Sequence, residues 1–187
     1  FTNDTIVPCS IGCAVSASGT AFNGYRDIIL TGNATDIIFT NVSMNKSLIG
    51  FYPDNPSFPH EKNNLTIKWY LNVNVTNSTD NSPISGAQVV INDSFATNIF
   101  DGLTSVTGGI ATLTVTEFTM NGSVPFNVNA DTCTDVRDNI NITCFTPYNI
   151  SVNLSGSWNN TNIDVNRCKL LNMSFSKDSI ILSDTTP

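Results

Sequence analysis

Apolar and polar residues alternate strictly along residues 68–76. A period of two residues is typical of a β-strand that buries one face and exposes the other. The apolar face of this segment carries Trp69, Leu71, Val73 and Val75, and the polar face carries Lys68, Tyr70, Asn72 and Asn74. The alternation therefore predicts a half-buried strand.

Further short β segments follow this strand, and turn residues separate them. We predict strands near residues 87–91, 97–103, 110–118, 148–154 and 169–181. Gly108 and Gly109 are expected to form the turn between residues 97–103 and 110–118, because glycine tolerates the backbone conformations of tight turns. Several short strands at this spacing, with no helical period, predict a β-sandwich from about Lys68 onward.

The chain before residue 68 is also divided into short β segments by Gly, Asn and Asp. An Asp-Ile-Ile sequence occurs at residues 27–29 and again at 36–38, which suggests stacked rungs. A length of 187 residues can hold two small domains. We therefore expect an all-β protein with a smaller N-terminal β module at residues 1–66 and a sandwich domain at 67–187.

The chain has few charged residues and many small uncharged polar residues. Only 12% of the residues are charged, whereas the chain has 26 Asn and 42 Ser and Thr residues. The net charge is −7 and the basic residues are scattered, so nucleic acid is not an expected partner. The sequence has no run of about 18 apolar residues, so a membrane span is not expected. It does not open with a charged and then apolar leader, so we expect any signal peptide to have been removed.

The glycosylation acceptor pattern Asn-x-Ser/Thr is unusually dense. Random placement of 26 Asn and 42 Ser and Thr residues in 187 positions gives about six such sequons, and the chain has 14. This excess predicts an exported, heavily N-glycosylated protein; the alternative is that Asn-x-Thr merely suits exposed strand faces and turns. Both interpretations place these side chains in solvent: Asn3, Asn33, Asn41, Asn45, Asn64, Asn74, Asn77, Asn92, Asn121, Asn141, Asn149, Asn153, Asn159 and Asn172.

The five cysteines predict two disulfides in an exported chain. Cys133 and Cys144 form the best pair, because a bridge would close the polar segment between them and remove loop entropy worth about 2 to 3 kcal/mol. Cys9 and Cys13 form the second pair, with a glycine between them for the turn. Cys168 is then left as a buried thiol, or it pairs with Cys9, with Cys13 or with another chain.

Candidate metal sites and catalytic groups are few. His60 stands alone in a proline-rich loop and zinc-finger spacings are absent, so no metal-thiolate site and no cofactor are expected. The cluster of Asp131, Asp135 and Asp138 suits calcium, although a solvated acidic loop is the favoured interpretation. With no nucleophile motif and no phosphate loop, the chain is predicted not to be an enzyme.

Three short motifs carry a resemblance to a known family. Pro-Ile-x-Gly-Ala at residues 83–87 leads to a strand, Gly-Leu-Thr at 102–104 forms a corner, and Gly-x-Ala-x-Leu at 109–113 begins the next strand. With the runs WYLNVNV and TPYNISV, they resemble the Ig-like, carboxypeptidase-regulatory-type β-sandwich repeats of archaeal surface proteins. The chain departs from that pattern by inserting the loop between Cys133 and Cys144.

The segment before this sandwich, up to residue 71, is similar to the closing turns of a right-handed parallel β-helix, and a second sandwich is the alternative for this module. The C-terminal sequence SDTTP is similar to the linker that opens a further repeat in such proteins. The resemblance leaves open whether the chain is a whole subunit or a segment of a longer protein.

The resemblance implies a structural role at the cell surface: a subunit of an extracellular glycosylated filament, sheath or surface layer that contacts copies of itself through β-strands. The apolar tail around residues 180–182 could donate a strand to a neighbour, or it completes its own sheet. The alternative function is an adhesin or carbohydrate-binding module, for which Trp69, Tyr148 and Trp158 are candidate platforms. Of these three, Trp158 is expected to be exposed.

A covalent cross-link between a lysine and an asparagine, assisted by a buried glutamate, is a further possibility in surface sandwiches. Glu117 shares the parity of Leu113 and Val115 and is expected to point inward. Lys68 lies opposite the apolar face of its strand, so Lys169 is the better placed lysine.

Overall fold

The structure is a computed structural model that describes residues 28–31, 35–44, 46, 49–52, 63–122, 126–127, 140–166, 169–175 and 180–185. The chain divides into two compact units. One unit comprises Phe1–Ile67 and Phe118–Thr143, and the other comprises Lys68–Glu117 and Cys144–Pro187. Compactness does not test whether domains fold independently, so the predicted domains at residues 1–66 and 67–187 stay a prediction.

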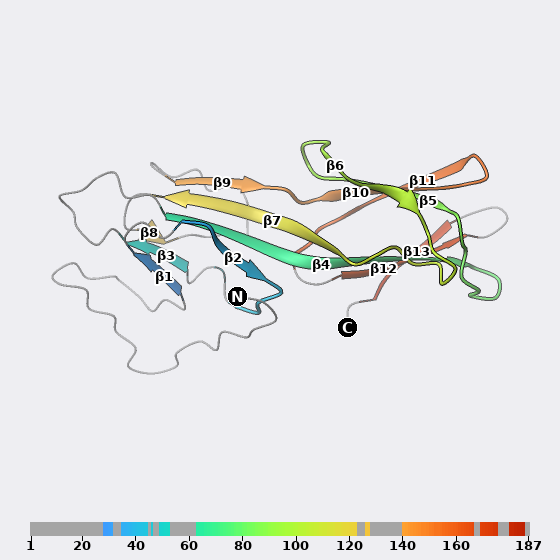
Figure 1. Cartoon of the computed structure of the whole chain (residues 1–187), viewed down its shortest axis with the longest axis horizontal. Helices are drawn as coiled ribbons and strands as arrows, with labels where there is room; N and C mark the ends of the chain where they lie inside the picture. The colour runs from blue at the N-terminus through green and yellow to red at the C-terminus, as the bar shows by residue number, and fades with distance from the viewer. Residues whose placement is uncertain are drawn as a thin grey trace. The chain divides into compact units, whose positions relative to one another are not determined.

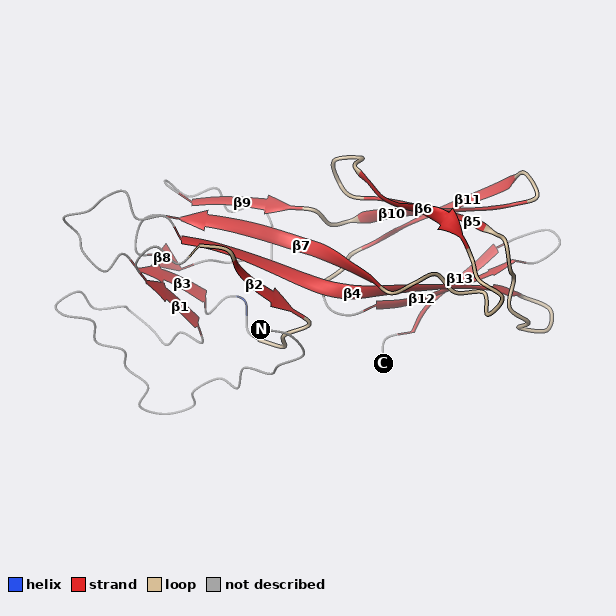
Figure 2. Cartoon of the chain, viewed as in Figure 1, coloured by secondary structure: helices blue, strands red, loops and turns tan. Residues whose placement is uncertain are grey.

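The second unit is built from two β-sheets, which appear as two layers of arrows in Figures 1 and 2. One sheet has the strand order β11 (Ser157–Ile163), β10 (Tyr148–Leu154), β5 (Gln88–Asn92) and β6 (Asn98–Leu103), and all its neighbouring strands are antiparallel. The other has the order β13 (Ile180–Thr185), β12 (Lys169–Phe175), β4 (Asn63–Asn77) and β7 (Leu113–Gly122). The predicted all-β sandwich is confirmed, although β4 and β12 pair in parallel.

The first unit contains shorter strands. A three-stranded sheet has the order β1 (Ile28–Thr31), β3 (Ile49–Tyr52) and β8 (Phe126–Asn127), while β2 (Ile37–Thr40) pairs with β4 and β9 (Ile140–Cys144) pairs with β7. The Ile-Ile pairs of the two Asp-Ile-Ile sequences lie in β1 and β2, which do not pair. Parallel neighbours need a crossover of about a dozen residues or more, and the link between these two strands is too short.

The core of the second unit follows the predicted alternation. The part of β4 in this unit buries its apolar face: Trp69 is 5% exposed, and the three aliphatic residues that follow it on this face are fully buried. The opposing sheet buries alternate residues of β5 and β10 in the same way. These core side chains are Leu71, Val73, Val75, Val89, Ile91, Tyr148, Ile150 and Val152.

Hydrogen bonds of the Thr104 side chain join the two motifs at residues 83–87 and 102–104. The Thr104 side chain is buried, and its hydroxyl donates a hydrogen bond of 2.7 Å to the carbonyl of Ile84. The same hydroxyl accepts the backbone N–H of Ala87 at 3.0 Å. One threonine therefore satisfies two backbone groups at the start of β5, where the ladder has not yet begun.

Three strands were not predicted from the sequence: β8, β9 and β11. The segment SWNNTNI of β11 has no apolar alternation, because it is an edge strand whose residues are half-buried at most. A two-residue turn joins β10 to β11. Leu154 pairs with Ser157, and both residues between them have positive φ, 51° at Ser155 and 89° at Gly156. Two positive φ values are the signature of a type I′ turn, which matches the twist of a β-hairpin.

Candidate functional site

The outer face of the four-stranded sheet carries rows of polar side chains. Because Val89, Ile91, Ile150 and Val152 point into the core, their neighbours along β5 and β10 point outward. The first row runs across the four strands through Asn98, Asn92, Asn149 and Asn162. Its amides are linked by hydrogen bonds from Asn98 Nδ2 to Asn92 Oδ1 at 3.2 Å and from Asn149 Nδ2 to Asn162 Oδ1 at 2.9 Å.

Two further rows complete this surface. The middle row is Asp101, Val90, Ser151 and Asn160, and the last row is Leu103, Gln88, Asn153 and Trp158. The Gln88 amide donates a hydrogen bond of 3.1 Å to the Asp101 carboxyl. We call the outward residues of these rows the amide face.

The described sequon asparagines all lie outside the core. Nine of the 14 have a described side chain, and none of the nine is buried: Asn41, Asn64, Asn74, Asn77, Asn92, Asn121, Asn149, Asn153 and Asn159. Three of them belong to the amide face, namely Asn92, Asn149 and Asn153. Their positions suit glycan attachment, and the attachment itself stays a prediction.

The other five sequon side chains lie outside the described residues: Asn3, Asn33, Asn45, Asn141 and Asn172. In the first unit, Asn64 donates a hydrogen bond from Nδ2 to Asn121 Oδ1 at 2.9 Å. Two sequons are therefore direct neighbours on β4 and β7, so a glycan on one would crowd the other.

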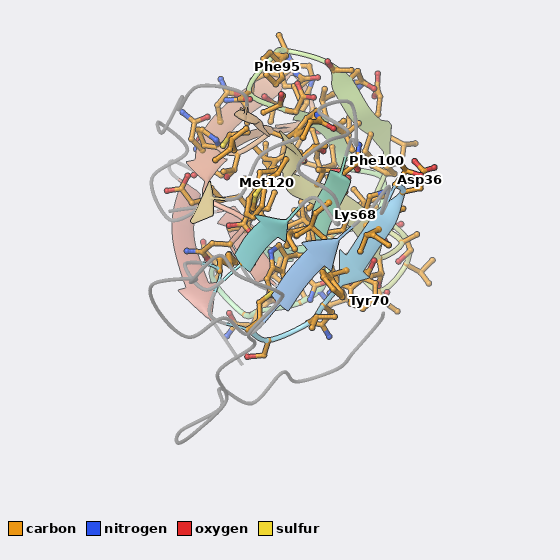
Figure 3. The ribbon with its side chains drawn as sticks, turned by 90° about the vertical axis from the view of Figure 1, so that its left-hand side faces the viewer. Asp36, Lys68, Tyr70, Phe95, Phe100 and Met120 are labelled. Atoms are coloured by element: carbon orange, nitrogen blue, oxygen red, sulfur yellow. The ribbon has the colours of Figure 1, made fainter. Side chains whose placement is uncertain are left out.

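Strand β6 combines an open edge with exposed apolar side chains. Among the described strands it pairs only with β5. Ile99 is 38% exposed and Leu103 is 65% exposed, and we call these two residues the β6 edge. The adjoining turns add Phe95, which is 60% exposed and lies at the rim of the side chains drawn in Figure 3, and Val106, which is 81% exposed. Exposed apolar edge strands are natural sites for pairing with another strand.

The three aromatic residues considered as platforms fall into two groups. Trp158 is 53% exposed, as predicted. Trp69 and Tyr148 are buried in the core, so neither can present a ring to a ligand in solution.

Each of these two core aromatics has a partner for its polar atom. Trp69 Nε1 donates a hydrogen bond of 2.6 Å to Glu117 Oε2, and the Tyr148 hydroxyl donates one of 2.7 Å to the Thr116 carbonyl. Burial raises the pKa of Tyr148 to about 12.

Glu117 is buried, which confirms its predicted inward orientation. Lys68 lies half-buried on the other side of its strand, which also carries Tyr70; both residues are labelled in Figure 3. The side chain of Lys169 lies outside the described residues, so the proposed covalent cross-link stays a prediction.

Cys144 is disulfide-bonded, and its partner lies outside the described residues. The predicted pairs Cys133 with Cys144 and Cys9 with Cys13 stay predictions, as does the partner of Cys168. The predicted calcium cluster of aspartates also falls outside the described ranges. Within those ranges, no three His, Cys, Asp or Glu side chains gather to hold a metal ion.

The apolar tail is paired within its own chain. Strand β13 lies antiparallel to β12, with Ile180 opposite Phe175 and Leu182 opposite Met173. The structure thus shows the alternative in which the tail completes its own sheet. The described residues contain no α-helix and therefore no helix able to cross a membrane.

No protein-family model and no curated protein sequence matches this chain. The solved structures that are similar to it include the following three. A 5-hydroxyisourate hydrolase of Klebsiella pneumoniae is 8% identical with a TM-score of 0.39, and the match covers 63% of this chain and 99% of the hydrolase. An (S)-allantoin synthase is 10% identical with a TM-score of 0.39, and the match covers 64% of this chain and 44% of the synthase.

The third similar structure is described as a "putative cell adhesion protein" from Bacteroides uniformis. It is 13% identical with a TM-score of 0.29, and the match covers 62% of this chain and 48% of that protein. The matched part thus spans less than half of the second and third structures.

The prediction that the chain is not an enzyme is contradicted by the first two of these structures and is withdrawn, since both are enzymes. A missing catalytic motif does not exclude an activity on a fold of this class, because function belongs to sites and not to folds. Likenesses at this identity concern the fold and assign no reaction to this chain.

Proposed function

We propose that this chain is a structural glycoprotein of the cell surface, with glycans on its exposed strand faces and with copies that associate along the β6 edge in a filament, sheath or surface layer. The observation that carries the proposal is the position of the sequons: none of the nine described sequon asparagines is buried. All nine are therefore accessible to glycosylation, and the number of sequons, 14 where chance gives about six, is what favours their use.

The composition supports the glycan part of the proposal. With only 12% charged residues, the surface depends on neutral polar groups for its hydration. Glycans on Asn92, Asn149 and Asn153 would extend this hydration over the amide face. The proposed location is extracellular, where sequons are modified and disulfides such as that of Cys144 persist.

The β6 edge supports the assembly part of the proposal. Soluble monomers commonly protect a free edge with lysine, proline or a bulge. Strand β6 has a register shift opposite Ile91 and Asn92, but it contains no lysine or proline, and the two residues of the β6 edge are apolar and exposed. A strand from a second copy of this chain would satisfy the free backbone groups of β6 and cover both side chains.

The test compares the assembly of Leu103→Lys with that of Val106→Lys by electron microscopy and light scattering of the glycosylated protein. Both sites are exposed, but Leu103 lies in the strand and Val106 lies in the following turn. We expect Leu103→Lys to abolish assembly and Val106→Lys to preserve it. A wild-type protein that stays monomeric, or equal losses in the two variants, would contradict assembly through β6.

A second candidate function is an adhesin or carbohydrate-binding module. The exposed Trp158 favours it, because an aromatic ring beside amide side chains can bind a sugar ring. Binding of oligosaccharides on a glycan array, lost in Trp158→Ala, would support this function over the structural one.

A further inference from the structure

We infer that Trp158 is the stacking platform for the first sugar of a glycan attached to Asn153. The inference rests on the proposed glycosylation and names the sequon that the indole serves. Its ligand is therefore a pyranose ring that is covalently held on the neighbouring strand of the same hairpin.

The register of the hairpin brings the two residues together. Asn153 on β10 lies directly opposite Trp158 on β11. Residues in this relation have Cβ atoms about 4.5 to 5.5 Å apart and point to the same side of the sheet. Because Val152, the residue before Asn153, points into the core, both Asn153 and Trp158 belong to the outward amide face.

The turn also fixes the amide of Asn153. Its Oδ1 accepts the backbone N–H of Gly156 at 2.9 Å. Among the described residues, the structure records no acceptor for Nδ2, which is the atom that carries an N-linked glycan. The oxygen is thus held by the turn, while the nitrogen remains available for the glycan beside the indole.

Trp158 has the exposed surface that this role requires. Its side chain is 53% exposed at the edge of the sheet, although tryptophan normally buries most of its area. The face of an indole ring carries negative charge density, which attracts the C–H groups of a sugar ring. A sugar on this ring would cover apolar surface that otherwise faces water.

A glycan on Asn159, the sequon next to Trp158 in the sequence, would not lie beside the indole. Asn159 lies opposite Val152, whose side chain is in the core, so Asn159 points away from the face that carries Trp158. A tethered sugar on Asn153 also has a high effective concentration at the indole, which favours it over a free sugar in solution.

The test is a double-mutant cycle on the glycosylated protein. Ser155→Ala removes the sequon but keeps Asn153 and its bond to Gly156, and Trp158→Ala removes the ring. We expect Trp158→Ala to lower the folding equilibrium constant roughly two- to tenfold when the glycan is present. In the Ser155→Ala background, the same substitution should have little effect. Nuclear Overhauser contacts between the first sugar and the indole protons should be lost in Ser155→Ala.

The outcomes separate this inference from the proposed function. Mass spectrometry of the Asn153 peptide comes first: an unmodified Asn153 beside other modified sequons overturns the inference alone. A modified Asn153 with additive effects of the two substitutions, and without sugar–indole contacts, also overturns it and leaves the surface glycoprotein in place. Equal effects of Trp158→Ala in both backgrounds, together with binding of a free oligosaccharide, would assign the ring to an external sugar.

As a matched control, Asn159→Gln removes the neighbouring sequon. It should leave the effect of Trp158→Ala unchanged, because Asn159 lies on the other face of the strand.

Discussion

At the scale of single residues, two core aromatics combine a large apolar surface with one satisfied polar atom. Trp69 donates to Glu117, which lies on β7, and Tyr148 donates to the backbone of Thr116. The loss of a hydrogen-bond partner lowers the free energy of unfolding more for a buried polar atom than for an exposed one, because water cannot replace the lost bond. These two bonds therefore favour one packing arrangement of β4, β7 and β10.

Trp69→Phe should lower the free energy of unfolding by about 1 to 3 kcal/mol. The substitution removes the hydrogen bond to Glu117 Oε2 and part of a buried ring. The measurement is chemical denaturation of deglycosylated protein, with Trp158→Phe as the control at an exposed site. Similar small losses in the two variants would show that the bond to Glu117 does not stabilise the core.

Tyr148 should make the protein less stable at alkaline pH. Its pKa is about 12 in the folded protein and ordinarily about 10. Below pH 10 its contribution is fully present; as the pH rises from 10 to 12, the unfolded state loses its proton first and stability falls by an amount on the order of 2 kcal/mol. Tyr148→Phe should remove this part of the decline in urea titrations, and unchanged slopes would contradict it.

At the scale of elements, the turn at residues 105–109 joins β6 of one sheet to β7 of the other. Gly108 there has a φ of 77°, and its carbonyl accepts the backbone N–H of Val75 at 2.8 Å. A Cβ at Gly108 would lie 2.5 Å from the Val75 carbonyl oxygen. The glycine thus serves both the positive φ and the close approach of the turn to β4.

Gly108→Ala should lower the free energy of unfolding by at least about 2 kcal/mol more than Gly86→Ala does. Both glycines have positive φ, 77° and 76°, so both substitutions strain the backbone, but a Cβ at Gly86 meets nothing within 4 Å. Thermal and denaturant unfolding of the two variants measures the difference. Equal losses would mean that the contact with β4 relaxes freely.

The elements also show what the sequence could predict. The alternation of apolar and polar residues in β4 and in β10 was sufficient to predict the positions of both strands. Strand β11 was missed because its polar residues carry no burial signal, although the Ser155-Gly156 pair is a turn signal that could have revealed the hairpin.

Missing β11 also hid part of the candidate site. Alternation along one strand shows which residues share a face, but it does not give the register with the next strand. The sequence alone shows only that Trp158 precedes Asn159, whereas the register places Trp158 opposite Asn153.

At the scale of the whole molecule, a chain with few charges presents an apolar edge and an amide-rich face. Removing all N-glycans from the native protein should therefore lower its solubility and increase association, even though no buried group changes. Light scattering during enzymatic deglycosylation measures this effect, and Leu103→Lys should reduce it. An equally soluble deglycosylated protein would show that the glycans are not needed for hydration.

Whether this protein is a surface glycoprotein can be decided by site-specific glycopeptide mass spectrometry of protein from its native source. We predict glycan mass on the described sequon asparagines, and the peptides that carry Asn92, Asn149 and Asn153 report on the amide face. Native protein in which every one of these asparagines is unmodified would contradict the account of a surface glycoprotein.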